Sequence, residues 1–193
     1  MWPTPVRALG YSMMTSLDGR INDASGSLEW VSIDEELHAF ANDQARAAGA
    51  FLYGRRLWET MAAYWPHGDE DPSEPEVIHD FARIWKAKPK VVYSSSLDAA
   101  PGATLVRHED ALAHIAALKA EPGGPLDIGG AELAASAIRA GLVDEIGMWV
   151  NPVILGGGAP MLPDDLPRLD LRLIERRDFA SGVVYLRYMV GRD

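Results

Sequence analysis

The sequence predicts one α/β domain, covering residues 1–193, with a mixed sheet between layers of helices. Three observations predict this class. Residues 126–160 read as strand, diglycine, helix and strand, which is the crossover unit of parallel pairing. Before that unit, short apolar runs alternate with segments of helical periodicity. Two alternating runs near the C-terminus are typical of antiparallel strands.

The crossover unit organises the rest of the chain. A short apolar run ends at Gly129-Gly130, a helix-compatible segment follows, and Gly141 stands where a left-handed cap is expected. A second apolar run covers 146–155. At the diglycine, backbone N–H groups and the positive helix end could hold a phosphate, or the pair could only make a tight turn. The apolar residues that indicate the helix are Leu133, Ala134, Ala137 and Ile138.

The first half of the chain follows the same alternation. A strand is expected over 6–14, a turn at Asp18-Gly19, and a helix from about Ile33 because Ser32 and Glu35 fit a capping box. That helix should end at Gly49. Its apolar stripe is Leu37, Phe40, Ala41, Ala45 and Ala48.

Later elements are shorter. Strands are expected over 50–53 and 90–93, and helices after Gly54 and over 77–85 and 110–120. The acidic, proline-rich segment 66–76 reads as an exposed loop rather than a metal site. The runs 169–176 and 182–190 should form an antiparallel pair at the sheet edge.

Composition excludes several functions. A net charge of −10 argues against a nucleic-acid partner, because phosphate backbones need a basic surface. There are no cysteines, hence no disulfides or thiolate chemistry. No apolar run approaches the roughly 18 residues of a membrane span, and no secretion signal is recognisable, so a cytoplasmic protein is expected. No metal-ligand cluster appears.

Three predicted strand ends carry groups suited to phosphates: Gly54-Arg55-Arg56, Ser94-Ser95-Ser96 and Gly129-Gly130. Ligands of open α/β sheets bind outside the carboxyl ends of strands, so together these groups favour a dinucleotide. Singly, the arginines could be surface charges and the serines a turn. No nucleophile elbow or His–carboxylate pairing is present, which favours chemistry carried by a cofactor.

The ordered blocks that cover nearly the whole chain resemble the dihydrofolate-reductase-like superfamily. Its riboflavin-biosynthesis reductase domain (the deaminase-reductase C-terminal domain) and stand-alone relatives are the most similar group. The blocks are MTSLDGRI (14–21), FLYGRRLWETM (51–61), VVYSSSLD (91–98), IGGAELAASAI (128–138) and VILGGGAPM (153–161). The resemblance implies a three-layer fold, a mainly parallel central sheet with an antiparallel C-terminal edge, and a homodimer.

The resemblance also implies NADPH, with NADH possible, across the strand ends. The implied cofactor contacts are Gly54, Arg55, Arg56, Ser94, Ser95, Gly129, Gly130, Ala131, Glu132 and Leu133. The loop with Leu17, Asp18 and Gly19 is implied to border nicotinamide and substrate, and Asp18 could orient substrate or relay a proton. Trp30, Trp58 and Trp65 are candidate walls of an apolar cleft, or core residues.

The sequence departs from these families at several points. Leu57 stands where dihydrofolate reductases carry a hydroxyl, and Glu132 would repel a phosphate. A folate-binding carboxylate should lie early in the first helix, where Asp34, Glu35 and Glu36 compete and Glu36 aligns best; these acids could equally serve the helix dipole. After His38 the sequence AFANDQARA lacks the basic substrate-phosphate element of riboflavin reductases, and the zinc deaminase half is absent.

The expected activity is therefore hydride transfer from a nicotinamide cofactor to a heterocyclic substrate that is pterin-, pyrimidine- or flavin-precursor-like. The resemblance implies an activity like that of a 5-amino-6-(5-phosphoribosylamino)uracil reductase or of a dihydrofolate reductase. Two alternatives stay open. One is a true dihydrofolate reductase with Glu36 as anchor. The other is a nucleotide-binding protein without turnover.

Overall fold

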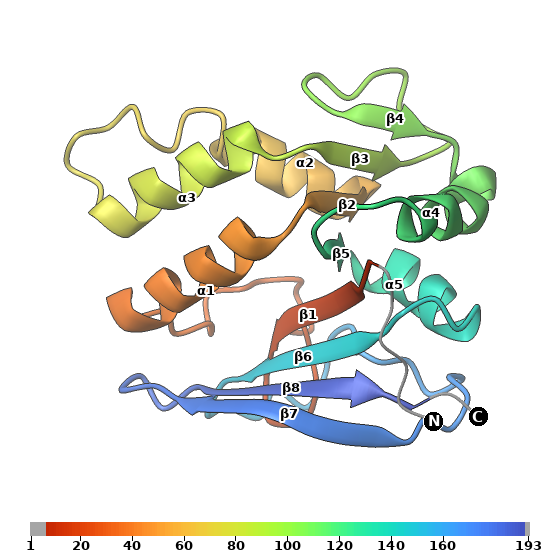
Figure 1. The fold of residues 1–193 in the computed structure, drawn as a ribbon. Helices are drawn as coiled ribbons and strands as arrows, with labels where there is room; N and C mark the ends of the chain where they lie inside the picture. Colours follow the sequence, from red (N-terminus) through yellow and green to blue (C-terminus); the bar gives the residue numbers. More distant parts are fainter. Residues whose placement is uncertain (1–6, 192–193) are drawn as a thin grey trace.

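The computed structural model describes residues 7–191, which form one eight-stranded sheet in the order β4-β3-β2-β5-β1-β6-β8-β7 (Figure 1). All pairs from β4 to β6 are parallel, and β8 is antiparallel to both of its neighbours. The predicted mixed sheet with an antiparallel C-terminal edge is confirmed. The strands are β1 (Leu9–Thr15), β2 (Ala50–Gly54), β3 (Lys90–Tyr93), β4 (Thr104–Val106), β5 (Leu126–Gly129), β6 (Glu145–Val150), β7 (Leu171–Asp178) and β8 (Val184–Val190).

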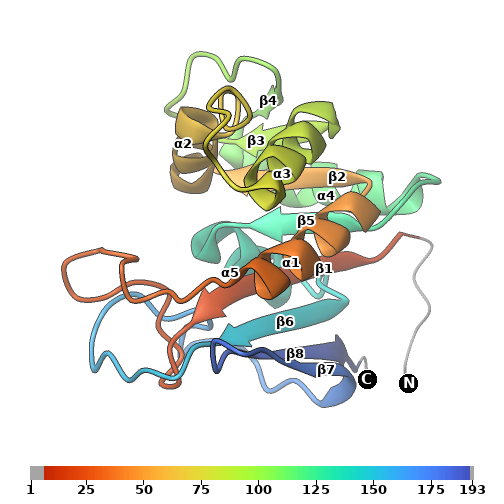
Figure 2. The same cartoon turned by 90° about the vertical axis from the view of Figure 1, so that its left-hand side faces the viewer.

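Helices cover both faces, so the predicted three layers are confirmed (Figure 2). One face carries α1 (Glu35–Ala47), α2 (Arg55–Tyr64) and α3 (Glu76–Ala87); the other carries α4 (Ala111–Ala120) and α5 (Ala131–Arg139). Alternation along β5 sends Leu126 and Ile128 toward α5 and leaves Asp127 on the α1 face. The site described below occupies that α1 face.

The first strand and first helix differ from the sequence prediction. The strand is Leu9–Thr15 rather than 6–14, and Val6 lies outside the described residues. The helix begins at Glu35, because Asp34 caps it by accepting a hydrogen bond from the N–H of Leu37 at 2.7 Å. The Ser32 capping box is therefore wrong.

Two glycines predicted as helix ends have different roles. Gly141 has φ +67°, which confirms the left-handed cap after α5. Helix α1 ends at Ala47, two residues before Gly49, but Gly49 has no positive φ and therefore does not form a left-handed cap. A Cβ on Gly49 would lie 2.7 Å from the carbonyl oxygen of Gly124, so this glycine permits a close approach of two loops instead.

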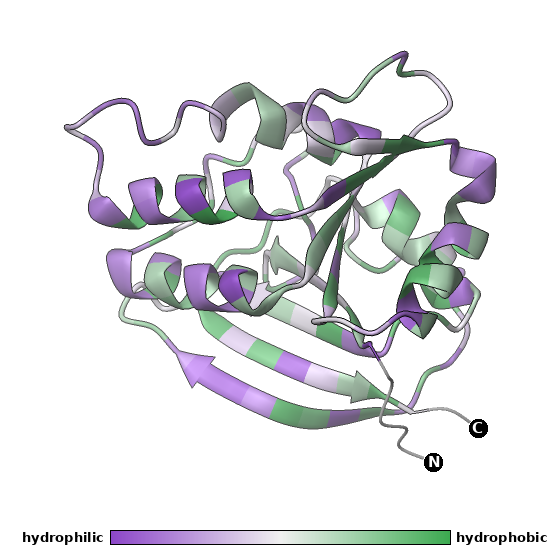
Figure 3. Ribbon diagram, turned by 45° about the horizontal axis from the view of Figure 1, so that its top comes forward, coloured by the Kyte–Doolittle hydropathy of each residue, from purple (hydrophilic) through white to green (hydrophobic). Residues whose placement is uncertain are grey.

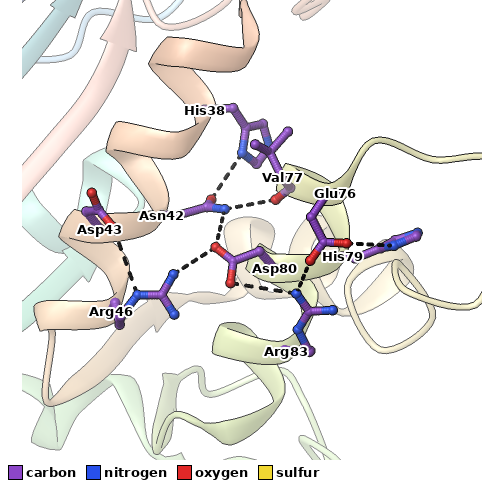
Figure 4. A network of polar contacts seen from close by, with 9 residues as sticks. All are labelled: His38, Asn42, Asp43, Arg46, Glu76, Val77, His79, Asp80 and Arg83. Carbon is purple, nitrogen blue, oxygen red and sulfur yellow. Dashed lines mark hydrogen bonds and ion pairs between the residues drawn. The ribbon is translucent and has the colours of Figure 1, made fainter.

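A polar seam joins α1 to α3 (Figure 4). Asn42 is 1% exposed and its amide donates to the carbonyl of Val77 at 2.8 Å and to Asp80 at 2.9 Å. Its oxygen must then accept from Nδ1 of His38 at 3.1 Å, which fixes the Nδ1–H tautomer of that ring. Arg46 completes the seam with a 2.8 Å ion pair to Asp80.

Other elements also differ from the sequence prediction, each for a local reason. The strand β4 and a short 3₁₀ helix (His108–Asp110) were not predicted, because three residues carry no readable periodicity. The apolar run 146–155 leaves the sheet after Val150, where the buried amide of Asn151 donates to the carbonyls of Thr15 and Trp149. None of the described helices has the length and apolar character needed to cross a bilayer.

Candidate active site

The N-terminal ends of α2 and α5 meet at the carboxyl edge of the sheet, because β2 and β5 are neighbours. Gly54 is the N-cap of α2 and Gly130 that of α5. Gly130 has φ +97°, a conformation that favours glycine, and a Cβ built on it would lie in van der Waals contact with the backbone nitrogen of Gly54, at 3.5 Å. Two sets of first-turn N–H groups thus converge on one region, an arrangement that favours an anion.

The two arginines of α2 are each paired with a glutamate. Arg55 donates through Nη1 to both carboxylate oxygens of Glu59, at 3.0 and 2.9 Å. Arg56 reaches across to α5 and pairs with Glu132 at 3.1 Å. The negative charge that the sequence places at the start of α5 is thereby offset by a guanidinium. Ala131 and the buried Leu133 complete this first turn.

The serines after β3 have unequal roles. Ser94 is buried, and its Oγ accepts from the N–H groups of Ser96 and Leu97, which closes the turn. Ser95 is exposed; its Oγ donates to Glu109 at 2.5 Å and accepts from the N–H of His108 at 3.0 Å. Ser95 is thus the accessible hydroxyl of the pair, and Ser94 shapes the loop.

Arg107 joins this strand end, a residue that the sequence reasoning missed. Its Nη1 donates to the carbonyl of Ser95 at 3.2 Å, because β4 lies beside β3 and brings its C-terminal end to the same edge. Since β4 itself escaped prediction, no sequence signal placed this guanidinium at the site.

A cavity of about 670 Å³ lies between α1 and the sheet. Small residues along the neighbouring strands, including Gly10, Ser12 and Gly147, leave the sheet face hollow there. The helix contributes short side chains and one amide, and its lining residues are Ala41, Gln44, Ala45, Ala47 and Ala48. The apolar side chains of Leu28, Val31 and Ile33, from the loop before α1, also line it. A mostly apolar cleft of this size suits a flat organic ring.

Two carboxylates line the cavity. Glu145 is bound by Arg187, whose Nη2 lies 2.5 Å and Nε 2.8 Å from its Oε2. Asp127 makes no hydrogen bond or ion pair with another residue of the described chain. Burial raises the pKa of Asp127 to about 6, because the charged form loses hydration. The carboxyl of Asp127 is therefore the cavity's unsatisfied acceptor.

Asp18 organises loops and does not line the cavity. Its carboxylate accepts from the hydroxyl of Ser16 at 2.6 Å and from the N–H groups of Leu155 and Gly156 at 3.0 and 2.9 Å. The Ser16 hydrogen bond, followed by the Leu155 amide, lowers the pKa of Asp18 to about 2. At neutral pH this carboxyl has no proton to relay, and the neighbouring Leu17 is largely exposed.

These contacts belong to a continuous junction between the first loop (residues 16–33) and the glycine-rich loop (151–160). Backbone bonds join Leu17 to Val153 at 2.7 Å and Ile21 to Ala159 at 2.9 Å. A Cβ on Gly158 would lie 1.9 Å from the carbonyl oxygen of Asn22, so only glycine fits there. Figure 2 shows the two loops beside each other beyond the strand ends.

The first turn of α1 places none of its three acids in the cavity. Asp34 caps the helix and also accepts from the N–H of Ser181 at 2.8 Å. Glu36 pairs with Arg177 of β7 at 2.9 Å, and Glu35 is exposed. The acids that line the cavity are on β5 and β6 instead, and of these only Asp127 has no partner among the described residues; its place between Leu126 and Ile128 was the available sequence signal.

The tryptophans named as candidate walls do not line the cavity either. Trp58 is 4% exposed and stacks on Trp85 with ring centroids 5.9 Å apart, so it is core. Trp65 packs against Phe81, and Trp30 donates its indole N–H to the carbonyl of Ser27. The α2 residues that line the cavity are Leu57 and Met61, and the Cδ2 of Leu57 would lie 2.3 Å from a Cβ on Gly129.

Comparison with known proteins agrees with this architecture. A family model described as the RibD C-terminal domain matches residues 7–185. The uncharacterized protein YyaP of Bacillus subtilis (strain 168) is 29% identical over 186 residues, which cover 94% of each chain.

Solved structures share the fold. A candidate riboflavin biosynthesis protein from Shewanella sp. PV-4 superposes with a TM-score of 0.68 at 22% identity, over 96% of this chain and 99% of that one. Dihydrofolate reductase from Enterococcus faecalis, complexed with NADP(H) and an inhibitor named RAB-propyl, gives 0.63 at 16% identity, over 96% and 97%. The fold is therefore dihydrofolate-reductase-like, as the sequence blocks predicted, and the chain belongs to the RibD C-terminal domain family.

Proposed function

We propose that the protein is an NADPH-dependent reductase that transfers hydride to a C=N or C=O bond of a flat heterocyclic substrate. The observation that carries the proposal is the convergence of the α2 and α5 N-termini beside an apolar cavity. Anion-binding N–H groups at a strand edge, next to a ring-sized cavity, form the two halves that a nicotinamide reductase needs.

The residues present fit a dinucleotide. Gly54 and Gly130 leave the backbone open at both helix N-termini, where a side chain would obstruct a pyrophosphate. Arg55 and Arg56 could exchange their glutamate partners for phosphate oxygens, and Ser95 with Arg107 could receive a 2′-phosphate. When bound, the nicotinamide would supply the hydride.

The chain itself would orient the ring and exclude water. Leu57 and the small residues of β1 would form an apolar wall, while the first loop would close the mouth. Asp18 would act through the loops, by holding the first loop against the glycine-rich loop. No group of His, Asp or Glu in the described part of the chain is arranged to hold a metal ion.

The test is a titration of the purified protein with NADPH and with NADH, in which quenching of its tryptophan fluorescence reports binding. We expect saturable binding of NADPH and, for Arg55→Ala, affinity weaker by about tenfold, the value of one solvent-exposed charge-assisted contact. Arg83→Ala is the matched control, because Arg83 is also an exposed helical arginine paired with a glutamate, Glu76, on α3.

Absence of binding of either nucleotide would refute the reductase proposal. Binding that is lost equally in the Arg55 and Arg83 variants would refute the assigned location. Binding without oxidation of NADPH by any pterin or pyrimidine would favour the nucleotide-binding alternative. The dihydrofolate reductase alternative would need a substrate anchor other than Glu36, which pairs with Arg177.

We also propose that the protein forms a homodimer through β7. This strand is at the sheet edge, and its first half exposes Leu171, Leu173 and Ile174 before turning polar (Figure 3). An edge strand has unpaired backbone N–H and C=O groups, and exposed apolar side chains on it favour association with a second strand. Sedimentation equilibrium should give a dimer mass that Leu173→Lys shifts to the monomer; a monomeric wild-type protein would refute this.

A further inference from the structure

The carboxyl group of Asp127 lies where no catalytic or cofactor role assigned above requires an acid. It is in the middle of β5, on the face that lines the cavity. Its lateral neighbours in the sheet are Phe51 of β2 and Gly10 of β1. Parallel neighbours lie about 4.8 Å apart, so the carboxyl borders both positions.

Gly10 leaves open space beside that carboxyl. A Cβ built on Gly10 would find its nearest heavy atom, the carbonyl oxygen of Leu126, 3.9 Å away. Across β1, Gly10 pairs with Glu145, so two carboxylates flank one glycine on the same face of the sheet. The floor between them is backbone, over which a flat ring can lie.

Only one of the two carboxylates is available to a ligand. Glu145 is engaged by Arg187, which also contacts Glu175 at 3.3 Å. The α1 residues that line the cavity carry no charge. The remaining titratable groups on the lining are the phenols of Tyr11, Tyr53 and Tyr185, and burial raises the pKa of all three. Asp127 thus faces the cavity with free acceptor capacity.

We propose that Asp127 is a specificity-determining residue, whose carboxylate accepts two parallel hydrogen bonds from a ligand edge that carries a ring N–H beside an exocyclic amino group. Such amidine-like edges occur in 2-amino-4-oxopyrimidine rings. The inference rests on the proposed function only in taking the cavity as the substrate site.

The chemistry of the cavity selects this class of ligand. A carboxylate offers acceptors only, so it matches two donors and opposes a carbonyl. A simple amine would pair with the carboxylate but leave the apolar walls of a 670 Å³ cavity uncovered. A planar ring with two donors would pair with the carboxylate and also contact those walls. A site built to bind a donor also discriminates strongly against an analogue that lacks it, because a buried partner is then left unpaired.

Pterin and lumazine form a matched pair of probes, because they differ only in an amino group or a carbonyl at position 2. Direct binding of each would be measured by calorimetry without any nucleotide. The wild-type protein should prefer pterin by about tenfold or more, the cost of one buried unpaired acceptor. Asp127→Asn presents one donor and one acceptor, which match the lactam edge of lumazine, so the preference should disappear or reverse.

A pH series gives a second readout. Below pH 6 the protonated carboxyl also offers one donor and one acceptor, so the wild-type preference for pterin should decline toward that of the variant. Asp164→Asn is the control, because Asp164 is exposed and does not line the cavity; the preference of this variant should equal that of wild type.

Each outcome decides the proposal. Equal affinities for the two probes in wild type, an Asp127→Asn variant that keeps the pterin preference, or no binding of either probe would overturn it. Nucleotide titration is independent of this result: NADPH binding without pterin preference would leave the proposed reductase standing and remove Asp127 from substrate selection.

Discussion

In the protein without a ligand, the ionised carboxyl of Asp127 should lower the free energy of unfolding at neutral pH. Its pKa is raised from an ordinary 3.8 to about 6, so the folded state binds this proton more tightly than the unfolded state does. The protonated carboxyl therefore contributes fully to the free energy of unfolding below pH 3.8. This contribution is lost as the pH rises through 6 and the carboxyl ionises in the folded state. At about 1.4 kcal/mol for each pH unit, a shift of about two units corresponds to at most about 3 kcal/mol at pH 8.

Asp127→Asn removes the charge and keeps the shape. The variant should therefore be more stable than wild type by up to about 3 kcal/mol at pH 8 and by about half of that at pH 5. Urea unfolding at pH 5, 6, 7 and 8 measures the difference, with Asp164→Asn as the control for a lost surface charge. A difference that is independent of pH, or a less stable variant at pH 8, would refute the reasoning about burial.

Three further predictions concern the frame around the site. Asn42→Ala should lower the free energy of unfolding, measured in urea, by about 1–3 kcal/mol, because the carbonyl of Val77 and the carboxylate of Asp80 on α3 lose their donor. An unchanged urea midpoint would contradict this. Gly129→Ala should destabilise by about 1–3 kcal/mol and weaken NADPH binding, and Leu57→Ala should rescue both by removing the clash; no rescue would place the fault elsewhere. Asp18→Ala should raise protease cleavage in both the first loop and the glycine-rich loop, whereas cleavage in one loop alone would disprove their coupling.

The fold could largely be read from the sequence because its signals are local. The diglycine before α5 and Gly141 after it bracket that helix, and alternation identified β7 and β8. The start of α1 was misread because Ser32 and Asp34 both suit an N-cap, and only Asp34 reaches the N–H of Leu37.

The site was less predictable, since it depends on which residues share a sheet face. The helix N-termini at Gly54 and Gly130 follow from strand ends, which sequence patterns reveal. The hollow over Gly10 and the exposure of Asp127 to it depend on the register of β1 with β5. Register comes from tertiary pairing, so the chain order alone left Asp127 looking like an ordinary polar residue in a strand.

The junction between the first loop and the glycine-rich loop has a kinetic consequence. Leu17 and Ile21 donate their amides to Val153 and Ala159, so neither loop can swing away while the other stays in place. Amide hydrogens on both sides should then exchange with solvent at one shared rate, set by a single opening event. The entrance to the cavity would behave as one gate with one time constant, and a ligand's residence time could be no shorter than that gate allows.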